Sequence, residues 1–318
     1  MRKLVLLVTG GLAVLALTAG PGAAAPAAAV GSDVCNGWEA AGSGAFDSLS
    51  TLTGSSATAR GTGNVIREPS LNATYEALPD SAKGKGGPKF KATVPVWFHV
   101  VSDGALGNVT QAQIDEQMTV LNLAFAGFYG GVKSGFKFEL AGVTRTDNAD
   151  WFYAGIGGSG ERPMKRALHR GGFETLNVYS TTAGPYLGWA YLPGLSDSQL
   201  YLDGIVSDWA AMPGTSDQYA GAYDLGLTLV HEAGHWVNLE HTFFGGCNAK
   251  GDFVDDTPAM KVPTSGCPPD GTKDTCPNDP GFDPIHNYMD YSYDKCYTEF
   301  TAGQVARAQD AWLHFRAP

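Results

Sequence analysis

The sequence has few cysteines, few histidines and no long hydrophobic run after its first twenty residues. Of 318 residues, 5 are cysteine and 7 are histidine. Basic residues are outnumbered, with 21 Lys and Arg against 32 Asp and Glu, for a formal net charge of −11. This balance disfavours nucleic acid and anionic membranes as partners. The lack of a later apolar run of ~20 residues excludes a membrane span downstream of the N-terminus.

The one hydrophobic run lies at the very start of the chain. Met1, Arg2 and Lys3 precede the mostly apolar residues 4–19, and alanine-rich residues 23–29 follow. A charged start, a short apolar stretch and small residues at a cleavage point are typical of a signal peptide. We therefore expect residues 1–29 to be removed and the protein to be secreted, with no membrane association afterwards.

The pattern of apolar residues predicts alternating strands and helices. Thr110 is a candidate cap for a helix over 111–125, and His99 is expected to be a core histidine. The expected strands cover 94–101, 136–143, 175–180, 188–193 and 203–207, and the other helices cover 162–169, a segment from about 224–226 onward, and 301–315. This alternation favours an α+β fold with a mixed sheet.

Three of the histidines lie close together in the sequence. His231 and His235 are four residues apart, so on a helix they lie on one face and can offer two imidazoles to one metal ion. Glu232 completes the pattern His-Glu-x-x-His. His241 can reach the same ion only if the helix ends and the chain bends back. Asn238 lies at the expected bend, where a left-handed residue is favoured.

Such a histidine set predicts a catalytic zinc site. Three protein ligands leave one position for water, whereas structural zinc sites are closed by four protein ligands. Zinc lowers the pKa of that water to about 7, and Glu232 can take its proton and pass it to a leaving amine. The alternative is a buried amphipathic helix with incidental histidines.

The run from His231 to His241 resembles the metzincin metallopeptidases, and its continuation to Cys247 is similar to their pappalysin family. Asn238 departs from that pattern, which has glycine there. The further segments that fit the family in order and spacing are Gly251 to Pro258, Asn287 to Tyr291 and Phe300 to Gln304. The resemblance covers about 92–318. It implies an upper subdomain, 92–241, with a twisted sheet and the zinc helix above a cleft, and an irregular, disulfide-stapled lower subdomain, 242–318, with a C-terminal helix.

The resemblance also implies roles for single residues. Met289 would pack beneath the zinc, and Tyr291 would donate to the developing oxyanion, unless it is an ordinary core tyrosine. Trp189 and Ala190 would lie on the edge strand that binds substrate through its main chain, although this segment could also be an interior strand. Asp294 would line the pocket for the side chain after the scissile bond and favour Arg, then Lys. The alternative is that Asp294 is a surface charge, or is neutralised by its neighbour.

Four of the five cysteines follow His241. In an exported chain they predict two disulfides, and the sequence alone permits three pairings. A second zinc site is the alternative, although no C-x-x-C pair is present. The resemblance favours Cys247 with Cys276 and Cys267 with Cys296.

The same part of the chain is acidic, and clustered carboxylates with loop carbonyls suit calcium. Because family relatives bind calcium near the zinc site, Asp252, Asp255 and Thr257 are candidate ligands. The alternative is an acidic, solvated loop.

Residues 30–91 are rich in Gly, Ala, Ser and Thr, which predicts a pro-segment and linker, or a disordered leader. Cys35 is the only cysteine there, and its thiolate could occupy the open zinc position and keep the enzyme latent. The Arg preference further suggests self-processing before Arg60 or Arg67.

We therefore expect a secreted, monomeric zinc endopeptidase that hydrolyses peptide or protein substrates. One alternative is a secreted module that binds zinc without turnover, which the intact Glu232 argues against. Another is a metal-dependent hydrolase of non-peptide amides.

Overall fold

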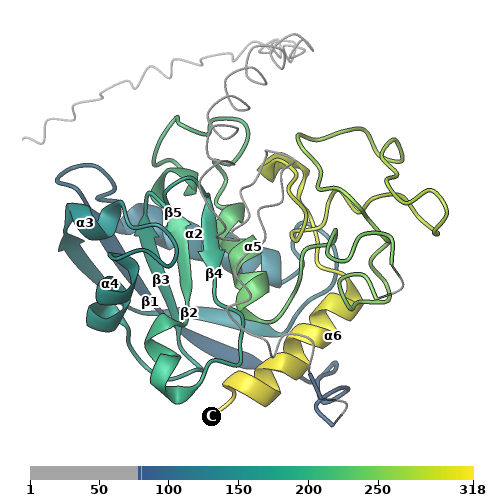
Figure 1. Cartoon of the computed structure of the whole chain (residues 1–318), viewed down its shortest axis with the longest axis horizontal. Coiled ribbons are helices and arrows are strands. Elements are labelled where there is room, and N and C mark those ends of the chain that lie inside the picture. The colour runs from purple at the N-terminus through teal and green to yellow at the C-terminus, as the bar shows by residue number, and fades with distance from the viewer. Residues whose placement is uncertain (1–77, 80, 249) are drawn as a thin grey trace, which may run out of the picture.

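The computed structural model describes residues 78–79, 81–248 and 250–318. A sheet with its helices forms one side of the molecule, and irregular chain with helix α6 (Ala302–Ala311) forms the other (Figure 1). The expected signal peptide, Cys35, Arg60 and Arg67 lie outside the described residues.

The sheet has five strands in the order β2-β1-β3-β5-β4. Its strands are β1 (Ala92–Ser102), β2 (Phe136–Asp147), β3 (Leu176–Thr181), β4 (Gly188–Ala190) and β5 (Ile205–Asp208). β1 pairs in parallel with β2 and β3, and β3 pairs in parallel with β5. β4 alone is antiparallel, on the outer side of β5. The mixed sheet is confirmed, and β4 lies at its edge.

Helices cover both faces of the sheet, and each face has its own core. Helices α2 (Gln111–Phe125) and α5 (Leu227–Trp236) pack on one face, around residues such as Val96, Phe98 and Ile205. The other face carries α3 (Ala149–Phe152) and α4 (Glu161–Leu168). Two 3-10 helices, η2 (Asp197–Leu202) and η3 (Trp209–Ala211), flank β5 in the sequence. Helix α2 begins at a capping box, in which Thr110 and Gln113 each satisfy the other's backbone N–H.

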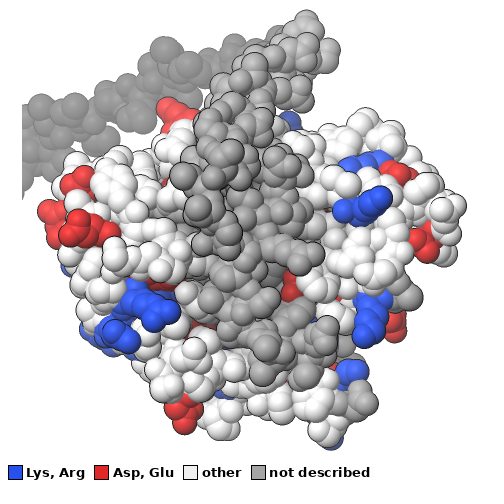
Figure 2. Space-filling model, viewed as in Figure 1, with Lys and Arg blue, Asp and Glu red and all other residues white. Residues whose placement is uncertain are grey.

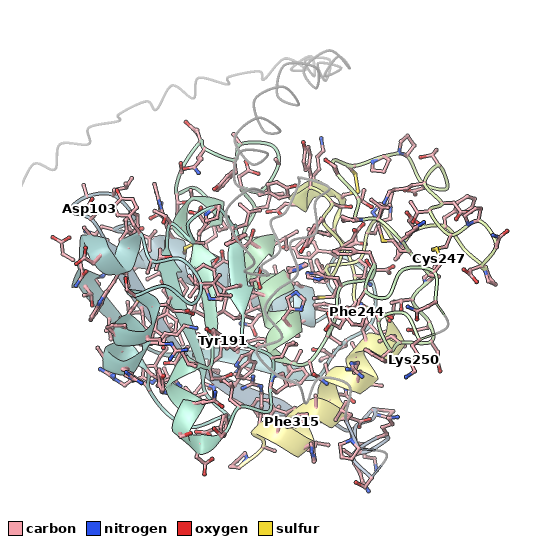
Figure 3. All side chains as sticks on the ribbon, viewed as in Figure 1. Asp103, Tyr191, Phe244, Cys247, Lys250 and Phe315 are labelled. Atoms are coloured by element: carbon pink, nitrogen blue, oxygen red, sulfur yellow. A yellow bond between two sulfur atoms is a disulfide. The ribbon has the colours of Figure 1, made fainter. Side chains whose placement is uncertain are left out.

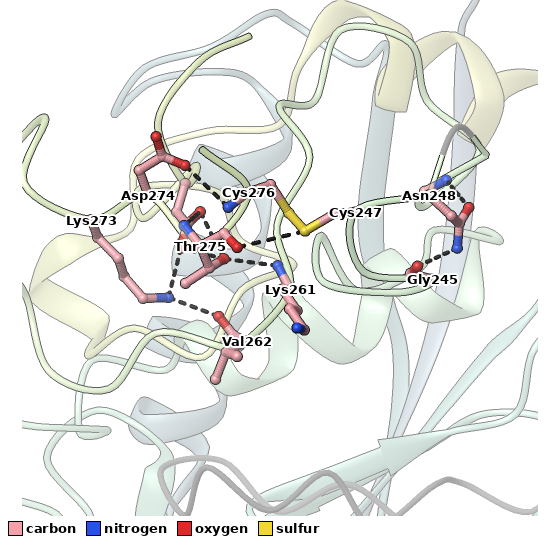
Figure 4. The surroundings of a disulfide bond; sticks show 11 residues. Gly245, Cys247, Asn248, Lys261, Val262, Lys273, Asp274, Thr275 and Cys276 are labelled. Carbon is pink, nitrogen blue, oxygen red and sulfur yellow. Dashed lines mark hydrogen bonds and ion pairs between the residues drawn. A yellow bond between two sulfur atoms is a disulfide. The ribbon is translucent and has the colours of Figure 1, made fainter. Parts of the chain in front are cut away.

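The chain after His241 contains little regular structure. Its regular elements are the short 3-10 helix η4 (Asp294–Cys296), α6 and a final π-helical turn, η5 (Trp312–Arg316). Cys247 is bonded to Cys276 and Cys267 to Cys296, the pairing that the resemblance favours. Around the first bridge, the Thr275 hydroxyl accepts from the Lys261 N–H at 2.8 Å (Figure 4). These cysteines are therefore committed to disulfides rather than to a second zinc site.

Part of the segment that the sequence assigns to the linker is bonded to α6. The backbone N–H groups of Gly84, Lys85 and Gly86 donate to the Asp310 carboxylate at 2.6–2.7 Å. Gly86 lies so close to α6 that an added Cβ would be 2.4 Å from Oε1 of Gln309. Residues 84–86 are therefore held by the folded domain, although they lie before residue 92.

The described surface carries both signs of charge. Basic and acidic side chains are interspersed over the described part of the face in view (Figure 2). Among the described residues, no helix is long and apolar enough to cross a membrane.

His99 lies in the middle of β1 and is fully buried, as expected of a core histidine. Its Nδ1 lies 2.8 Å from the Thr144 hydroxyl and its Nε2 lies 3.0 Å from Oδ1 of Asn177. Burial lowers the pKa of His99 from 6.5 to about 4. Folding therefore holds this imidazole neutral.

We predict that His99 makes the protein acid-sensitive. Between pH 6.5 and 4 the unfolded chain takes up a proton that folded His99 does not, so the free energy of unfolding falls as the pH falls, by up to about 3 kcal/mol. Urea unfolding at pH 7 and pH 4.5 should show a smaller pH dependence in His99→Asn than in wild type. The control is His314→Asn, at an exposed histidine. An unchanged pH dependence in His99→Asn would contradict the prediction.

Candidate metal centre

The three histidines of the sequence motif meet at one point. Helix α5 is buried along its whole length and presents His231 and His235 on one face. The Nε2 atom of His235 lies 3.1 Å from that of His231 and 3.0 Å from that of His241. One nitrogen from each of the three rings lies within 4.8 Å of the others. This spacing suits three ligands of a single ion.

Backbone carbonyls orient two of these rings. The Nδ1 atom of His231 lies 2.6 Å from the Tyr288 carbonyl oxygen, and that of His235 lies 2.8 Å from the Leu239 carbonyl oxygen. A carbonyl oxygen only accepts, so each Nδ1 carries the hydrogen and each Nε2 keeps its lone pair. The two Nε2 atoms lie 3.1 Å apart, so their lone pairs repel each other unless a cation lies between them. The residues therefore fit a metal ion, bound through Nε2.

The bend that delivers His241 begins directly after α5. Asn238 has φ = 74°, in the left-handed region. Its N–H donates to the His235 carbonyl oxygen at 2.8 Å, and the N–H of Leu239 donates to that of Gly234 at 2.9 Å. Asparagine tolerates this conformation better than other residues with a side chain, so the departure from glycine keeps the bend.

Phe243 is a site residue that sequence reasoning missed. Its ring stacks on that of His241, with centroids 4.7 Å apart and an interplanar angle of 8°. It also meets the Tyr291 ring edge to face, with centroids 4.8 Å apart. In the sequence, the feature that could have identified Phe243 is an aromatic residue two positions after the third histidine. Stacking on Phe243 limits rotation of the one ligand that α5 does not carry.

Met289 lies directly behind the metal helix and is fully buried. A Cβ added at Gly234, between the two helical histidines, would lie 2.3 Å from the Met289 sulfur. Gly234 therefore lets this segment approach the helix, which brings the Tyr288 carbonyl to His231. The side chain of Asn287 holds the turn, because its Oδ1 accepts from the Met289 N–H at 3.0 Å.

Glu232 and Tyr291 both lie beside the histidine cluster. Glu232 is 5% exposed, and an added Cβ on Gly188 of β4 would lie 3.0 Å from its Cγ. The Tyr291 hydroxyl lies 3.1 Å from Nε2 of His241. The Tyr291 hydroxyl therefore borders the point at which the three imidazoles converge, and Glu232, next to His231 on α5, faces Gly188 of β4.

Trp189 and Ala190, which were expected to bind substrate, are both buried, and their side chains lie on opposite faces of the sheet. Trp189 packs in the core on the far face of the sheet, where its Nε1 donates to Glu161 at 2.9 Å. Ala190 belongs to the core on the α5 face. The Trp189 and Ala190 side chains are therefore both taken up by the protein's own core. In Figure 3, Tyr191, which follows β4, and Phe244, which follows the bend, lie on either side of α5.

Asp294 is buried at the start of the metal helix. Its Oδ2 accepts from the N–H of Leu225 at 2.9 Å and from that of Leu227 at 3.4 Å. Helix α5 has no capping side chain of its own, because Gly226 is its N-cap. The Asp294 carboxylate takes that role from 67 residues away.

The candidate calcium ligands are partly brought together. The Thr257 hydroxyl lies 2.7 Å from Oδ1 of Asp252 and 2.8 Å from the Val254 carbonyl oxygen. Burial raises the pKa of the Asp252 carboxyl to about 6. Its Oδ2 has no hydrogen-bond partner among the described residues. Asp255, in contrast, is exposed.

The mixed sheet, the buried histidine helix, the bend and the methionine beneath them define a metzincin-type metallopeptidase. More narrowly, the chain belongs to peptidase family M43, the pappalysins, whose sequence model, described as pregnancy-associated plasma protein-A, matches residues 194–312. It is 45% identical over 231 residues to an extracellular metalloprotease of Pyricularia oryzae, which covers 71% of this chain and 76% of the relative. It is 38% identical over 282 residues to one of Arthroderma benhamiae, with coverage of 86% and 90%.

Solved structures agree with this assignment. A structure of mirolysin in complex with compound 9 superposes with a TM-score of 0.63 at 28% identity, covering 70% of this chain and 92% of that one. Mature mirolysin of Tannerella forsythia, in complex with a cleaved peptide, gives a TM-score of 0.60 at 28% identity, with the same coverage. The chain is a secreted zinc metallopeptidase.

Proposed function

We propose that His231, His235 and His241 hold the zinc ion through their Nε2 atoms, in an endopeptidase whose proton carrier is Glu232. The convergence of these atoms, with Nδ1 of two rings fixed as donors, carries the proposal. When bound, zinc acts as a Lewis acid and lowers the pKa of water to about 7.

The chain's own residues would supply the remaining chemistry. Glu232 accepts a proton from the attacking water and returns it to the leaving amine. The Tyr291 hydroxyl donates to the oxygen on which negative charge develops. The outer edge of β4 offers main-chain N–H and C=O groups to an extended substrate, which lets the enzyme hold different sequences in one register. The Glu232 and Tyr291 side chains are both buried, and the exclusion of water strengthens their electrostatic interactions.

We predict that Glu232→Gln lowers kcat by about 10² to 10⁴-fold, because the ligands survive and only the proton carrier is lost. Zinc content, measured by atomic absorption, should stay at the wild-type level. His241→Ala should instead lose zinc. Full activity in zinc-loaded Glu232→Gln would refute the mechanism. A zinc-loaded wild type that cleaves small amides but no denatured protein would favour the non-peptide hydrolase.

We propose further that Asp294 favours Arg, then Lys, after the scissile bond. Its carboxylate is fixed by the N–H groups of Leu225 and Leu227, beside the entry to α5. A fixed carboxylate pairs with a guanidinium through two hydrogen bonds and with an ammonium less completely. The same preference supports self-processing before Arg60 or Arg67, upstream of the residues bonded to Asp310. That would remove a pro-segment carrying Cys35, whose thiolate would keep the enzyme latent.

We predict that Asp294→Asn loses most of the basic preference while neutral substrates are still cleaved, because asparagine keeps an oxygen acceptor for the two backbone N–H groups and removes only the charge. The measurement is a mass-spectrometric cleavage profile on a peptide library, together with the N-terminus of the secreted protein. Lys295→Gln, at the exposed neighbour, is the control and should keep the wild-type profile. An undiminished preference in Asp294→Asn would show that Asp294 does not select the substrate.

Calcium is a second proposed ion, held by the Asp252 carboxylate, the Val254 carbonyl and Thr257. These are oxygen ligands of the type that calcium selects. The buried Oδ2 of Asp252 supports the proposal, because a buried carboxylate oxygen without a partner is costly.

We predict that millimolar calcium raises the melting temperature of the wild type but not that of Asp252→Asn, because an ion that binds only the folded state stabilises it by mass action. Asp255→Asn, at an exposed position, tests whether that residue takes part. The same melting temperature with calcium and with a chelator in the wild type would rule out this site.

A further inference from the structure

Two arginines from the far end of the chain donate to backbone carbonyls at the end of the metal helix and in the bend that follows it. Nε of Arg307, in α6, donates to the Asn238 carbonyl oxygen at 2.8 Å. Nε of Arg316, in η5, donates to the Trp236 carbonyl oxygen at 2.8 Å. Trp236 is the last residue of α5, and Asn238 is the left-handed residue of the bend. Both arginines therefore act between the second and third histidines.

Carbonyls at a helix C-terminus need partners from outside the helix, and positive charge there is favourable. The carbonyls of Gly234 and His235 accept from backbone N–H groups of the bend itself. The carbonyl of Leu239 lies against Nδ1 of His235. Those of Trp236 and Asn238 receive their donors from the two arginines, so the path of the chain from His235 to His241 depends on the C-terminal helix.

The two arginines are themselves held in place. Arg316 is buried, pairs through two nitrogens with Asp203 at 2.8 and 3.0 Å, and lies over the Trp236 ring, 3.7 Å from its centroid. The guanidinium of Arg307 lies 5.4 Å from the centroid of the Phe253 ring. These contacts restrict the rotation of both side chains, so each presents its Nε–H in a fixed direction.

We infer that Arg307, assisted by Arg316, is a positioning residue for the third metal ligand, since it fixes the bend that brings His241 to the other two histidines. The inference rests on the proposed zinc ligands. Arg307 acts on His241 indirectly, through the backbone of Asn238, because its Nε donates to the Asn238 carbonyl oxygen. Its loss should weaken zinc binding by about 10 to 100-fold, the usual effect of removing a group that orients a ligand.

The test is a double-mutant cycle between Arg307→Gln and His241→Ala, with zinc affinity measured by competition with a chromophoric chelator. In the wild-type background, Arg307→Gln should weaken zinc binding at least tenfold. In the His241→Ala background it should have no further effect, because the ligand that it positions is gone. Equal effects in the two backgrounds would show a general structural role and overturn the inference.

Two further variants keep the outcome clear. Arg166→Gln removes an exposed arginine that lies over the Tyr201 ring, far from α5 in sequence, and should leave zinc affinity unchanged. Arg307→Lys, which keeps the charge but not the planar Nε donor, should lie between wild type and Arg307→Gln, and serves if the glutamine variant does not fold. Unaltered zinc affinity in His241→Ala itself would overturn the proposed ligand set. Weakened binding in His241→Ala with wild-type affinity in Arg307→Gln would overturn only the role of Arg307.

Discussion

The structure depends on the close approach of two imidazole rings, His231 and His235, whose Nε2 atoms face one another. Without a cation between them, the facing lone pairs repel each other, so the fold must hold the His231 and His235 rings in place despite this repulsion. It does so with the carbonyls of Tyr288 and Leu239, which fix the hydrogens on Nδ1. One carbonyl comes from the turn of residues 287–289, called here the methionine turn, and the other from the bend after the helix. The metal helix therefore cannot form its site without both neighbouring segments.

Helix α6 supports both the methionine turn and the bend, through polar side chains spaced along its length. The Asp256 carboxylate accepts from Thr301 and Gly303 at its N-terminus. Gln304 and Asn287 pair through both side-chain amides, at 2.7 and 3.0 Å, which fixes the methionine turn. Arg307 reaches the bend, and Asp310 binds the chain before β1. One short helix thus connects the candidate calcium loop, the metal site and the start of the domain. The two disulfides brace the same irregular chain at other points.

The edge strand is anchored from the opposite face of the sheet. Trp189 and Tyr191 both donate to Glu161, which lies 3.2 Å from the fully buried Lys165 amine. A buried ion pair adds little net stability, but loss of one partner leaves an uncompensated charge. The pair therefore serves to hold β4 in place beside Glu232. This explains why the tryptophan of β4 points away from the histidine cluster.

The sequence by itself determined the histidine helix, the need for a bend at Asn238, the mixed sheet and the need for disulfides after His241, because spacing and periodicity are local properties. The element bounds for α2, 111–125, match for the same reason. Local signals do not show which distant groups meet. Tertiary structure alone decided that Asp294 caps α5 and that Trp189 faces the far core. It also decided that Arg316 binds the last carbonyl of the metal helix and Arg307 a carbonyl of the bend. The contacts of Asp294, Arg307 and Arg316 join residues 67 to 80 positions apart, where hydrogen bonds form only after the surrounding core has packed.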